Sequence, residues 1–109
     1  MNKKVSIIIP CYNQGMYVAE AIQSALDQTY NDIEIVCVND ASTDNSREVI
    51  RKFADEHNNI IFIDNPENKG VIASRNKAIA ACSGEYILPL DADDIFKTYL
   101  CRKGDAGLR

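Results

Sequence analysis

Two short apolar runs with a helical pattern between them indicate the fold. The first run is Val5-Ser6-Ile7-Ile8-Ile9-Pro10, and the second is Ile33-Glu34-Ile35-Val36-Cys37-Val38. Both are rich in β-branched residues, which favour strands. The segment 17–29 between them carries apolar residues at helical spacing. Those on its apolar face are Val18, Ile22, Ala25 and Leu26. We therefore expect a strand, a helix and a second strand.

The same alternation continues to residue 90. Ser42-Thr43-Asp44 offers capping side chains to a second helix. The apolar face of that helix comprises Val49, Ile50, Phe53 and Ala54. Further along, we predict a third strand over 60–63, an Ala-rich helix over 71–82 and a fourth strand over 86–90. The fourth strand contains Pro89, which has no backbone N–H to donate to a neighbouring strand. Strands that alternate with helices predict an α/β fold with about four parallel strands flanked by helices.

Polar residues follow each of these strands. They are Tyr12-Asn13, Asn39-Asp40, Asp64-Asn65 and Asp91-Ala92-Asp93-Asp94. Right-handed crossovers place the carboxyl ends of parallel strands on one edge of the sheet, where open α/β sheets bind ligands. We expect the candidate site at this edge.

The charge is unevenly distributed over the 109 residues. The chain is 46% hydrophobic and 26% charged, which is typical of a globular protein and excludes disorder as its main state. The net charge of −4 comprises −7 in residues 1–96 and +3 in residues 97–109. An acidic chain of this kind argues against a nucleic-acid partner held by a basic face.

The cysteines and the N-terminal segment bear on location. Cys11, Cys37, Cys82 and Cys101 are widely spaced, and with the single histidine His57 they form no zinc-ligand pattern. We interpret them as thiols in a reducing compartment rather than as a disulfide framework. The apolar stretch that ends at Pro10 is too short for a signal peptide. We expect a cytoplasmic location, with peripheral membrane contact left open.

The sequence contains neither of the two common phosphate-binding loops. There is no G-x-G-x-x-G after the first strand and no G-K-[ST]. An acidic edge binds a phosphorylated ligand when Mg²⁺ or Mn²⁺ lies between the carboxylates and the phosphates, and Asp91 and Asp93 are candidate ligands. About one D-x-D match is expected by chance in this composition, so a solvated acidic turn is the alternative. An EF-hand is excluded because Ile95 and Phe96 stand at its fifth and sixth positions.

Three other residues are candidates for ligand contacts. The Asp40 carboxylate could accept an N–H from a ligand base, or it could belong to a turn. The Tyr12 ring could lie against that base, or pack half-buried. Arg75 could bind a diphosphate through charge-assisted hydrogen bonds, or be a surface charge.

Five blocks in order resemble family 2 glycosyltransferases of the GT-A fold. They are 5–13, Ala25-Leu26-Asp27-Gln28-Thr29-Tyr30, Val38-Asn39-Asp40-Ala41-Ser42-Thr43-Asp44, Asn65 to Gly70 with Ala73-Ser74-Arg75-Asn76, and 84–94. Each block alone is a weak signal, but the ordered set is specific. The resemblance covers residues 5 to about 96.

The resemblance implies a partial GT-A, Rossmann-like nucleotide-sugar-binding part over 1–96, and residues 97–109 form an unmatched basic tail. It implies that Pro10 and Tyr12 line the base site, that Asp40 hydrogen-bonds the base, commonly uracil, and that Arg75 lies near the nucleotide. It implies contacts of Asp91 with ribose or metal-bound groups, and of Asp93 with Mg²⁺ or Mn²⁺ at the diphosphate. A UDP-sugar donor and a role in cell-surface polysaccharide biosynthesis follow from the same resemblance.

Two departures from the family pattern stand out. Ala41 replaces the usual Gly, and because alanine occupies positive φ only with strain, a shifted loop is expected there. Family members continue beyond the D-x-D block with an acceptor site and a carboxylate base for inverting transfer, so the resemblance implies a truncated chain with no catalytic residue of its own. The acceptor is therefore unknown.

Two other functions compete with donor binding. One is a non-catalytic nucleotide-binding or self-associating fragment that uses the exposed edge of an incomplete sheet. The other is a D-x-D metal-dependent phosphohydrolase with Asp91 as nucleophile. In such enzymes the motif usually follows the first strand, whereas here it follows the fourth.

Overall fold

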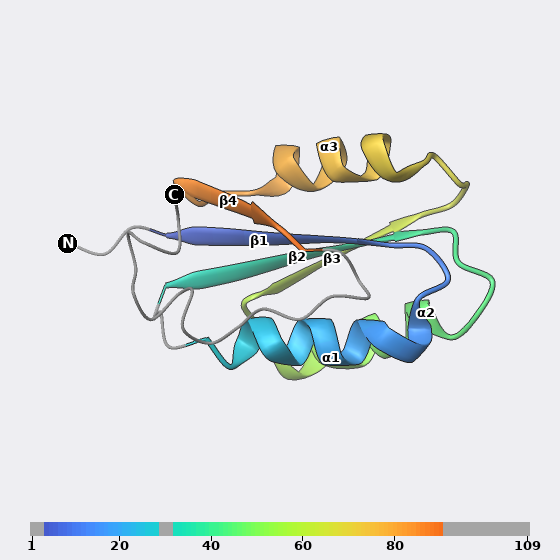
Figure 1. Ribbon diagram of the computed structural model, residues 1–109, viewed down its shortest axis with the longest axis horizontal. Helices are drawn as coiled ribbons and strands as arrows, with labels where there is room; N and C mark the ends of the chain where they lie inside the picture. Colours follow the sequence, from blue (N-terminus) through green and yellow to red (C-terminus); the bar gives the residue numbers. More distant parts are fainter. Residues whose placement is uncertain (1–3, 29–31, 91–109) are drawn as a thin grey trace.

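The computed structural model describes residues 4–28 and 32–90 (Figure 1). Strands and helices alternate along the chain, as expected from its periodicity. The elements are β1 (Val5–Cys11), α1 (Gly15–Leu26), β2 (Ile33–Asp40), α2 (Ser46–Glu56), β3 (Ile60–Asn65), α3 (Val71–Ala81) and β4 (Tyr86–Pro89). Among the described helices, none combines the length and the apolar character needed to span a membrane.

The strands form a parallel sheet in the order β3-β2-β1-β4. Helices α1 and α2 cover one face, and α3 covers the other (Figure 1). The predicted α/β class with four parallel strands between helices is confirmed. Because β1 and β2 are the central strands, their carboxyl ends lie side by side in the middle of one edge, with Cys11 opposite Asn39.

Alternate residues of the central strands build two cores. Ile7, Ile9 and Ile35 point toward α1 and α2, where the predicted helical faces meet them. Ile8 and Val36 point toward α3 and pack with Ala78. Both faces of these strands are therefore buried, which explains their continuous apolar runs.

A buried carboxylate ties β4 to the amino ends of β1 and β2. Glu34 is 7% exposed and accepts hydrogen bonds from Ser6 Oγ (2.7 Å), Ser83 N (2.8 Å) and Ser83 Oγ (2.9 Å). Burial alone would raise the pKa of Glu34, but these bonds and nearby Lys4 lower it below its ordinary value. The carboxylate is thus kept ionised at the end of the sheet opposite the candidate site.

Pro89 lies in an edge strand, where its missing N–H is tolerated. The next residue, Leu90, donates its N–H to Ile8 O at 2.9 Å. Since neighbouring residues of a strand direct their backbone groups to opposite sides, Pro89 faces away from β1. The strand predicted over 86–90 ends at Pro89 in the structure.

The other boundaries differ from expectation by a few residues. Helix α1 begins at Gly15 rather than at residue 17, and it ends at Leu26 rather than at residue 29. Strand β2 continues two residues further, to Asp40. Asp40 is therefore held in the strand ladder opposite Asn65 and does not belong to the loop that follows.

Candidate functional site

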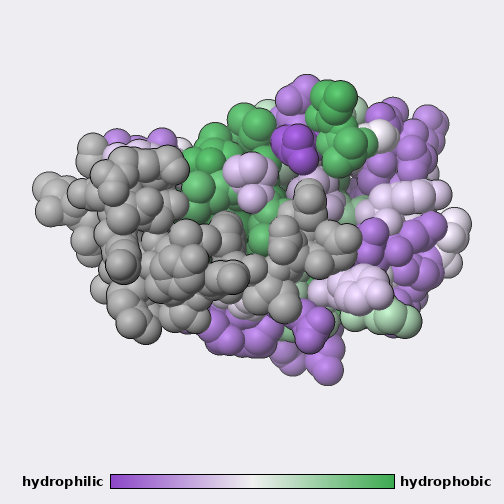
Figure 2. Space-filling model, viewed as in Figure 1, coloured by the Kyte–Doolittle hydropathy of each residue, from purple (hydrophilic) through white to green (hydrophobic). Residues whose placement is uncertain are grey.

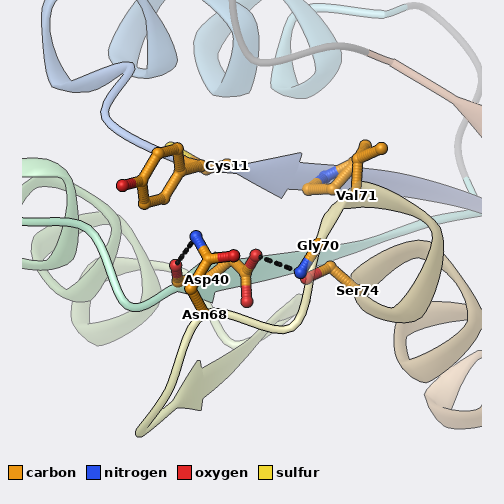
Figure 3. A pocket seen from close by; sticks show the side chains of 8 residues that line it. Cys11, Asp40, Asn68, Gly70, Val71 and Ser74 are labelled. Carbon is orange, nitrogen blue, oxygen red and sulfur yellow. Dashed lines mark hydrogen bonds between the residues drawn. The ribbon is translucent and has the colours of Figure 1, made fainter.

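A cavity of about 250 Å³ opens where β1 and β2 end and α3 begins (Figure 3). Its walls come from three segments of the chain. The lining residues are Pro10, Cys11, Tyr12, Asp40, Asn68, Gly70, Val71 and Ser74. The convergence predicted for the polar strand ends is confirmed for the described strands. The run 91–94 after β4 lies outside the described residues.

Asp40 is the central polar residue of this cavity. It is 3% exposed, and its carboxylate accepts hydrogen bonds from Lys69 N (2.7 Å), Asn65 Nδ2 (3.0 Å) and Gly70 N (2.9 Å). The Asp40 carbonyl also accepts a bond from Asn68 Nδ2 at 3.4 Å. One residue of β2 therefore holds the whole β3–α3 loop against the sheet.

The same contacts keep Asp40 ionised. Burial would raise its pKa, but the backbone N–H groups of Lys69 and Gly70 and the side chains of Asn65 and Ser74 together lower it below the ordinary value of 3.8. An ionised carboxylate only accepts hydrogen bonds. Toward a ligand, Asp40 therefore presents an acceptor and never a donor at neutral pH.

The opposite face of the same strand ends carries a second Asp–Asn pair. Asn39 Nδ2 donates to Asp64 Oδ1 at 2.9 Å, and Asp64 Oδ2 forms an ion pair with Arg47 Nε at 2.7 Å. This pair lies under α2, whereas the Asp40–Asn65 pair lies under α3. The two faces of the edge thus have matching polar chemistry, but only Asp40 reaches the cavity.

The loop after β1 is bound to the loop after β2 through Asn13. Asn13 Oδ1 accepts hydrogen bonds from Thr43 N (2.7 Å), Thr43 Oγ1 (3.3 Å) and Asp44 N (3.3 Å). In return, Asn13 N donates to Ser42 Oγ at 2.9 Å. We call these contacts, together with those of Asp44 described next, the loop interlock.

The Asp44 carboxylate lies at the beginnings of two helices. Its Oδ2 accepts from Gly15 N, the first residue of α1, at 3.0 Å. Its Oδ1 accepts from the N and Oγ of Ser46, the first residue of α2, at 2.9 and 2.6 Å. Burial would raise the pKa of Asp44, but these bonds lower it. The N-cap residue of α2 is Asn45, and its side chain makes no cap hydrogen bond. Asp44, one residue earlier than expected for a cap, bonds the first residue of both helices, whereas Ser42 bonds Asn13.

The candidate residues predicted from the sequence are only partly brought together. Pro10, Tyr12 and Asp40 all line the cavity, and Tyr12 is 48% exposed. Arg75 lies on α3 directly after Ser74 and is half-buried, but it is not among the lining residues. Asp91 and Asp93 lie outside the described residues, so their proposed contacts stay predictions.

Sequence reasoning did not single out the α3 side of the cavity. Asn68, Gly70 and Ser74 were recognised as part of a family block but given no role. The available signal was Gly70, which adopts φ 95° immediately before α3, a conformation that favours glycine. Because this loop turns sharply next to the carboxyl edge of the sheet, where a ligand is expected, it could have been expected to form one wall of the cavity.

The described cysteines are free thiols. Cys11 and Cys37 are buried, and Cys82 is half-buried. Burial raises the pKa of all three thiols, most strongly for Cys37. Cys101 lies outside the described residues. Helix α2 ends at Glu56, and the ring of the next residue, His57, stacks on Phe53 at a centroid distance of 6.2 Å.

Exposed hydrophobic side chains begin at the cavity wall with Val71 and continue along α3. In Figure 2 they gather over α3 and the edge strand β4. The exposed large hydrophobic residues on these two elements are Val71, Ile72, Ile79 and Ile87. Within residues 4–28 and 32–90, no three His, Cys, Asp or Glu side chains are grouped so that they could hold a metal ion.

Comparison with known proteins identifies the family. The sequence pattern of Glycosyl transferase family 2 matches residues 6–103. The chain belongs to glycosyl transferase family 2. A similar member of the family is glycosyltransferase GlyG of Streptococcus pneumoniae serotype 4, which is 38% identical over 97 residues. That alignment covers 89% of this chain and 32% of GlyG, so the chain spans about a third of the length of this relative.

Two solved structures share the fold. TarS 1–349 of S. aureus superposes with a TM-score of 0.85 at 29% identity, covering 94% of this chain and 31% of the TarS chain. TarS 1–349 has also been solved with UDP and with UDP-GlcNAc. The mannosyltransferase PcManGT of Pyrobaculum calidifontis, solved with GDP-Man and Mn²⁺, superposes with a TM-score of 0.87 at 24% identity, covering 99% of this chain and 32% of PcManGT. The expected GT-A fold is confirmed.

Proposed function

We propose that this chain is the donor-binding part of a glycosyltransferase that binds a UDP-sugar at the carboxyl edge of the sheet. The observation that carries the proposal is the buried, ionised Asp40 carboxylate on the wall of a cavity that Pro10 and Tyr12 also line. In this proposal the cavity binds the base, and the ribose and diphosphate extend from it across the strand ends. Membership of a glycosyltransferase family supports this use of the edge.

The size and chemistry of the cavity suit a single heterocyclic base. Its volume of about 250 Å³ is smaller than that of pockets for whole drug-sized ligands, which begin near 300 Å³. Asp40 can accept the N3–H of uracil, whereas cytosine has no hydrogen on N3. A carboxylate accepts about four hydrogen bonds, and the Ser74 hydroxyl, one of its four donors, can rotate away to make room for a ligand N–H.

The diphosphate would bind outside the cavity with the help of a cation. Asp40 and Asp44 already accept hydrogen bonds at the beginnings of all three described helices, where a phosphate could otherwise bind. We assign Asp91 and Asp93 to a Mg²⁺ or Mn²⁺ ion, which would offset the charge of the diphosphate. We place Arg75 close to the nucleotide, as its position after Ser74 allows.

The uracil preference is supported by TarS, which is 29% identical and binds UDP and UDP-GlcNAc. We place the acceptor site and the general base of inverting transfer in sequence beyond these 109 residues.

Titration of the chain with UDP and with CDP in the presence of Mn²⁺ tests the proposal. We expect wild-type protein to prefer UDP, and Asp40→Asn to reduce that preference, since an amide can donate a hydrogen bond to cytosine N3. Asp64→Asn is the matched control, because Asp64 ends the neighbouring strand but pairs with Asn39 on the other face. Failure of wild-type protein to bind UDP, or an unchanged UDP/CDP ratio in Asp40→Asn, would contradict the proposal.

A further inference from the structure

We propose that Asn13 and Asp44 are positioning residues that set where the Tyr12 side chain lies in the base site. This inference rests on the proposed function. Neither residue lines the cavity. Both act through the loop interlock, which joins the β1–α1 loop to the segment that follows β2.

Tyr12 lies between two fixed points of the chain. On one side, Cys11 is buried at the end of β1 and is held in the ladder opposite Asn39. On the other side, Asn13 is held at φ 52° by its four hydrogen bonds to residues 42–44. Asparagine is one of the few residues that adopts this conformation readily, so the side chain both permits the turn and anchors it.

Asp44 fixes the continuation of the same loop into α1. Its bonds to Gly15 N and Ser46 N hold the first turns of α1 and α2 together. The approach is so close that a Cβ on Gly15 would lie 2.0 Å from Asn45 Oδ1 and 3.0 Å from Ser46 N. The path from Tyr12 into α1 therefore cannot shift without breaking the contact with α2.

Both walls of the cavity are thus anchored to one short segment, residues 40–46. Asp40 holds the wall that Asn68 and Gly70 form, and Asp44 with its neighbours holds the wall that Tyr12 forms. The separation between the aromatic ring and the Asp40 carboxylate is consequently determined by this segment. A base that stacks on the ring and bonds the carboxylate at once requires that separation to be constant.

A double-mutant cycle measured by UDP titration with Mn²⁺ tests the inference. Asn13→Gly removes the acceptor but keeps the backbone conformation accessible. We expect Tyr12→Ala to weaken UDP binding about tenfold, in line with aromatic–base stacking, and Asn13→Gly to weaken it by a similar factor. If Asn13 acts through Tyr12, the double variant Tyr12→Ala/Asn13→Gly binds no more weakly than Tyr12→Ala alone.

Two further variants separate positioning from loss of stability. Asn13→Asp keeps an acceptor oxygen, so we expect it to recover most of the affinity that Asn13→Gly loses. Ser83→Ala breaks the bond to Glu34 at the other end of the sheet, so it lowers the melting temperature without changing UDP affinity. The inference would be overturned, with the proposed function unaffected, if the double variant lost affinity by the product of the two single factors. It would also be overturned if Ser83→Ala lowered the UDP affinity together with the melting temperature. Absence of UDP binding by the wild-type chain would overturn the proposed function as well.

Discussion

The Asp40 carboxylate accepts a hydrogen bond of 2.9 Å from the backbone N–H of Gly70, the residue that precedes α3. Asp44 makes the equivalent contact with the first residues of α1 and α2. Helix beginnings attract anions because their N–H groups are unpaired and the helix dipole is positive there. At or directly before the beginning of each described helix, a carboxylate of the chain accepts at least one backbone N–H, so a diphosphate meets negative charge at this edge.

We therefore predict that a divalent cation is required for diphosphate binding and dispensable for the base. The affinity for UDP should fall about fivefold or more when Mn²⁺ is removed by EDTA, since like charges a few ångströms apart cost about 1 kcal/mol or more. The affinity for uridine, which has no phosphate, should stay unchanged. Isothermal titration of both ligands with and without metal measures the difference. If the UDP affinity were the same in EDTA as in Mn²⁺, the proposed metal site would be contradicted but the proposed base site would not.

Ala41 is predicted to be a site where glycine stabilises the fold. Its φ of 58° lies in the left-handed region, which alanine occupies only with strain. An alanine in this conformation costs about 1–2 kcal/mol, and glycine would relieve that strain. Glycine also loses more conformational entropy on folding, which offsets part of the stability gained. We expect Ala41→Gly to raise the free energy of unfolding by about 0.5–1 kcal/mol in urea titrations.

Ala73→Gly is the matched control for this substitution. Ala73 is exposed within α3, where glycine should lower stability by about 1 kcal/mol. If Ala41→Gly were destabilising to the same extent, the strain attributed to Ala41 would be absent.

The helices and the candidate edge could be predicted because their signals are local. Val18, Ile22 and Ala25 repeat at the helical period and are buried on α1 as expected. The polar residues after the strands meet at one edge because every crossover in a parallel sheet returns the chain in the same direction. Both conclusions depend only on residues close together in the sequence: the spacing of apolar residues in a helix, and the polar residues that directly follow each strand.

The partners of the buried carboxylates could not be predicted, since they depend on strand order. Glu34 would be expected at the surface of a strand, yet it is buried by donors from Ser6 and Ser83, which are 28 and 49 residues away. Likewise, three donors to Asp40, from Asn65, Lys69 and Gly70, lie 25 to 30 residues further along. Only the adjacency of β2 to β3, of β1 to β4 and of β1 to β2 brings these groups together.

Gly84 is predicted to resist substitution at the beginning of the fourth strand. A Cβ at this position would lie 2.5 Å from Ser6 Oγ and 2.8 Å from Ser6 N. The hydroxyl could turn away, but the backbone nitrogen belongs to a buried central strand. We expect Gly84→Ala to lower the free energy of unfolding by about 1–3 kcal/mol. Ser6→Ala in the same background should not restore it, and full restoration would show that the hydroxyl alone makes the clash.

Acid should destabilise the protein through its buried carboxylates. The pKa values of Glu34, Asp40 and Asp44 are all lowered by hydrogen bonds that outweigh burial. A carboxylate with a lowered pKa contributes stability that is complete above its unfolded value, which is 3.8 for aspartate and 4.5 for glutamate, and that is lost as the pH falls through the folded value. We therefore expect a melting temperature that is level from pH 7 to about 5 and decreases below about pH 4.

Asp40→Asn separates the contribution of this residue from the others. At pH 7 the variant should be less stable by about 1–3 kcal/mol. The amide can accept only some of the hydrogen bonds that the carboxylate accepts, and its NH₂ group faces one of the N–H donors. As the pH falls through the lowered pKa of folded Asp40, the wild-type residue becomes protonated and meets the same conflict, so the difference between the two melting temperatures should shrink below about pH 4. Melting curves followed by circular dichroism between pH 3 and 7 measure this convergence. A difference that stays constant over that range would show that ionised Asp40 does not stabilise the β3–α3 loop.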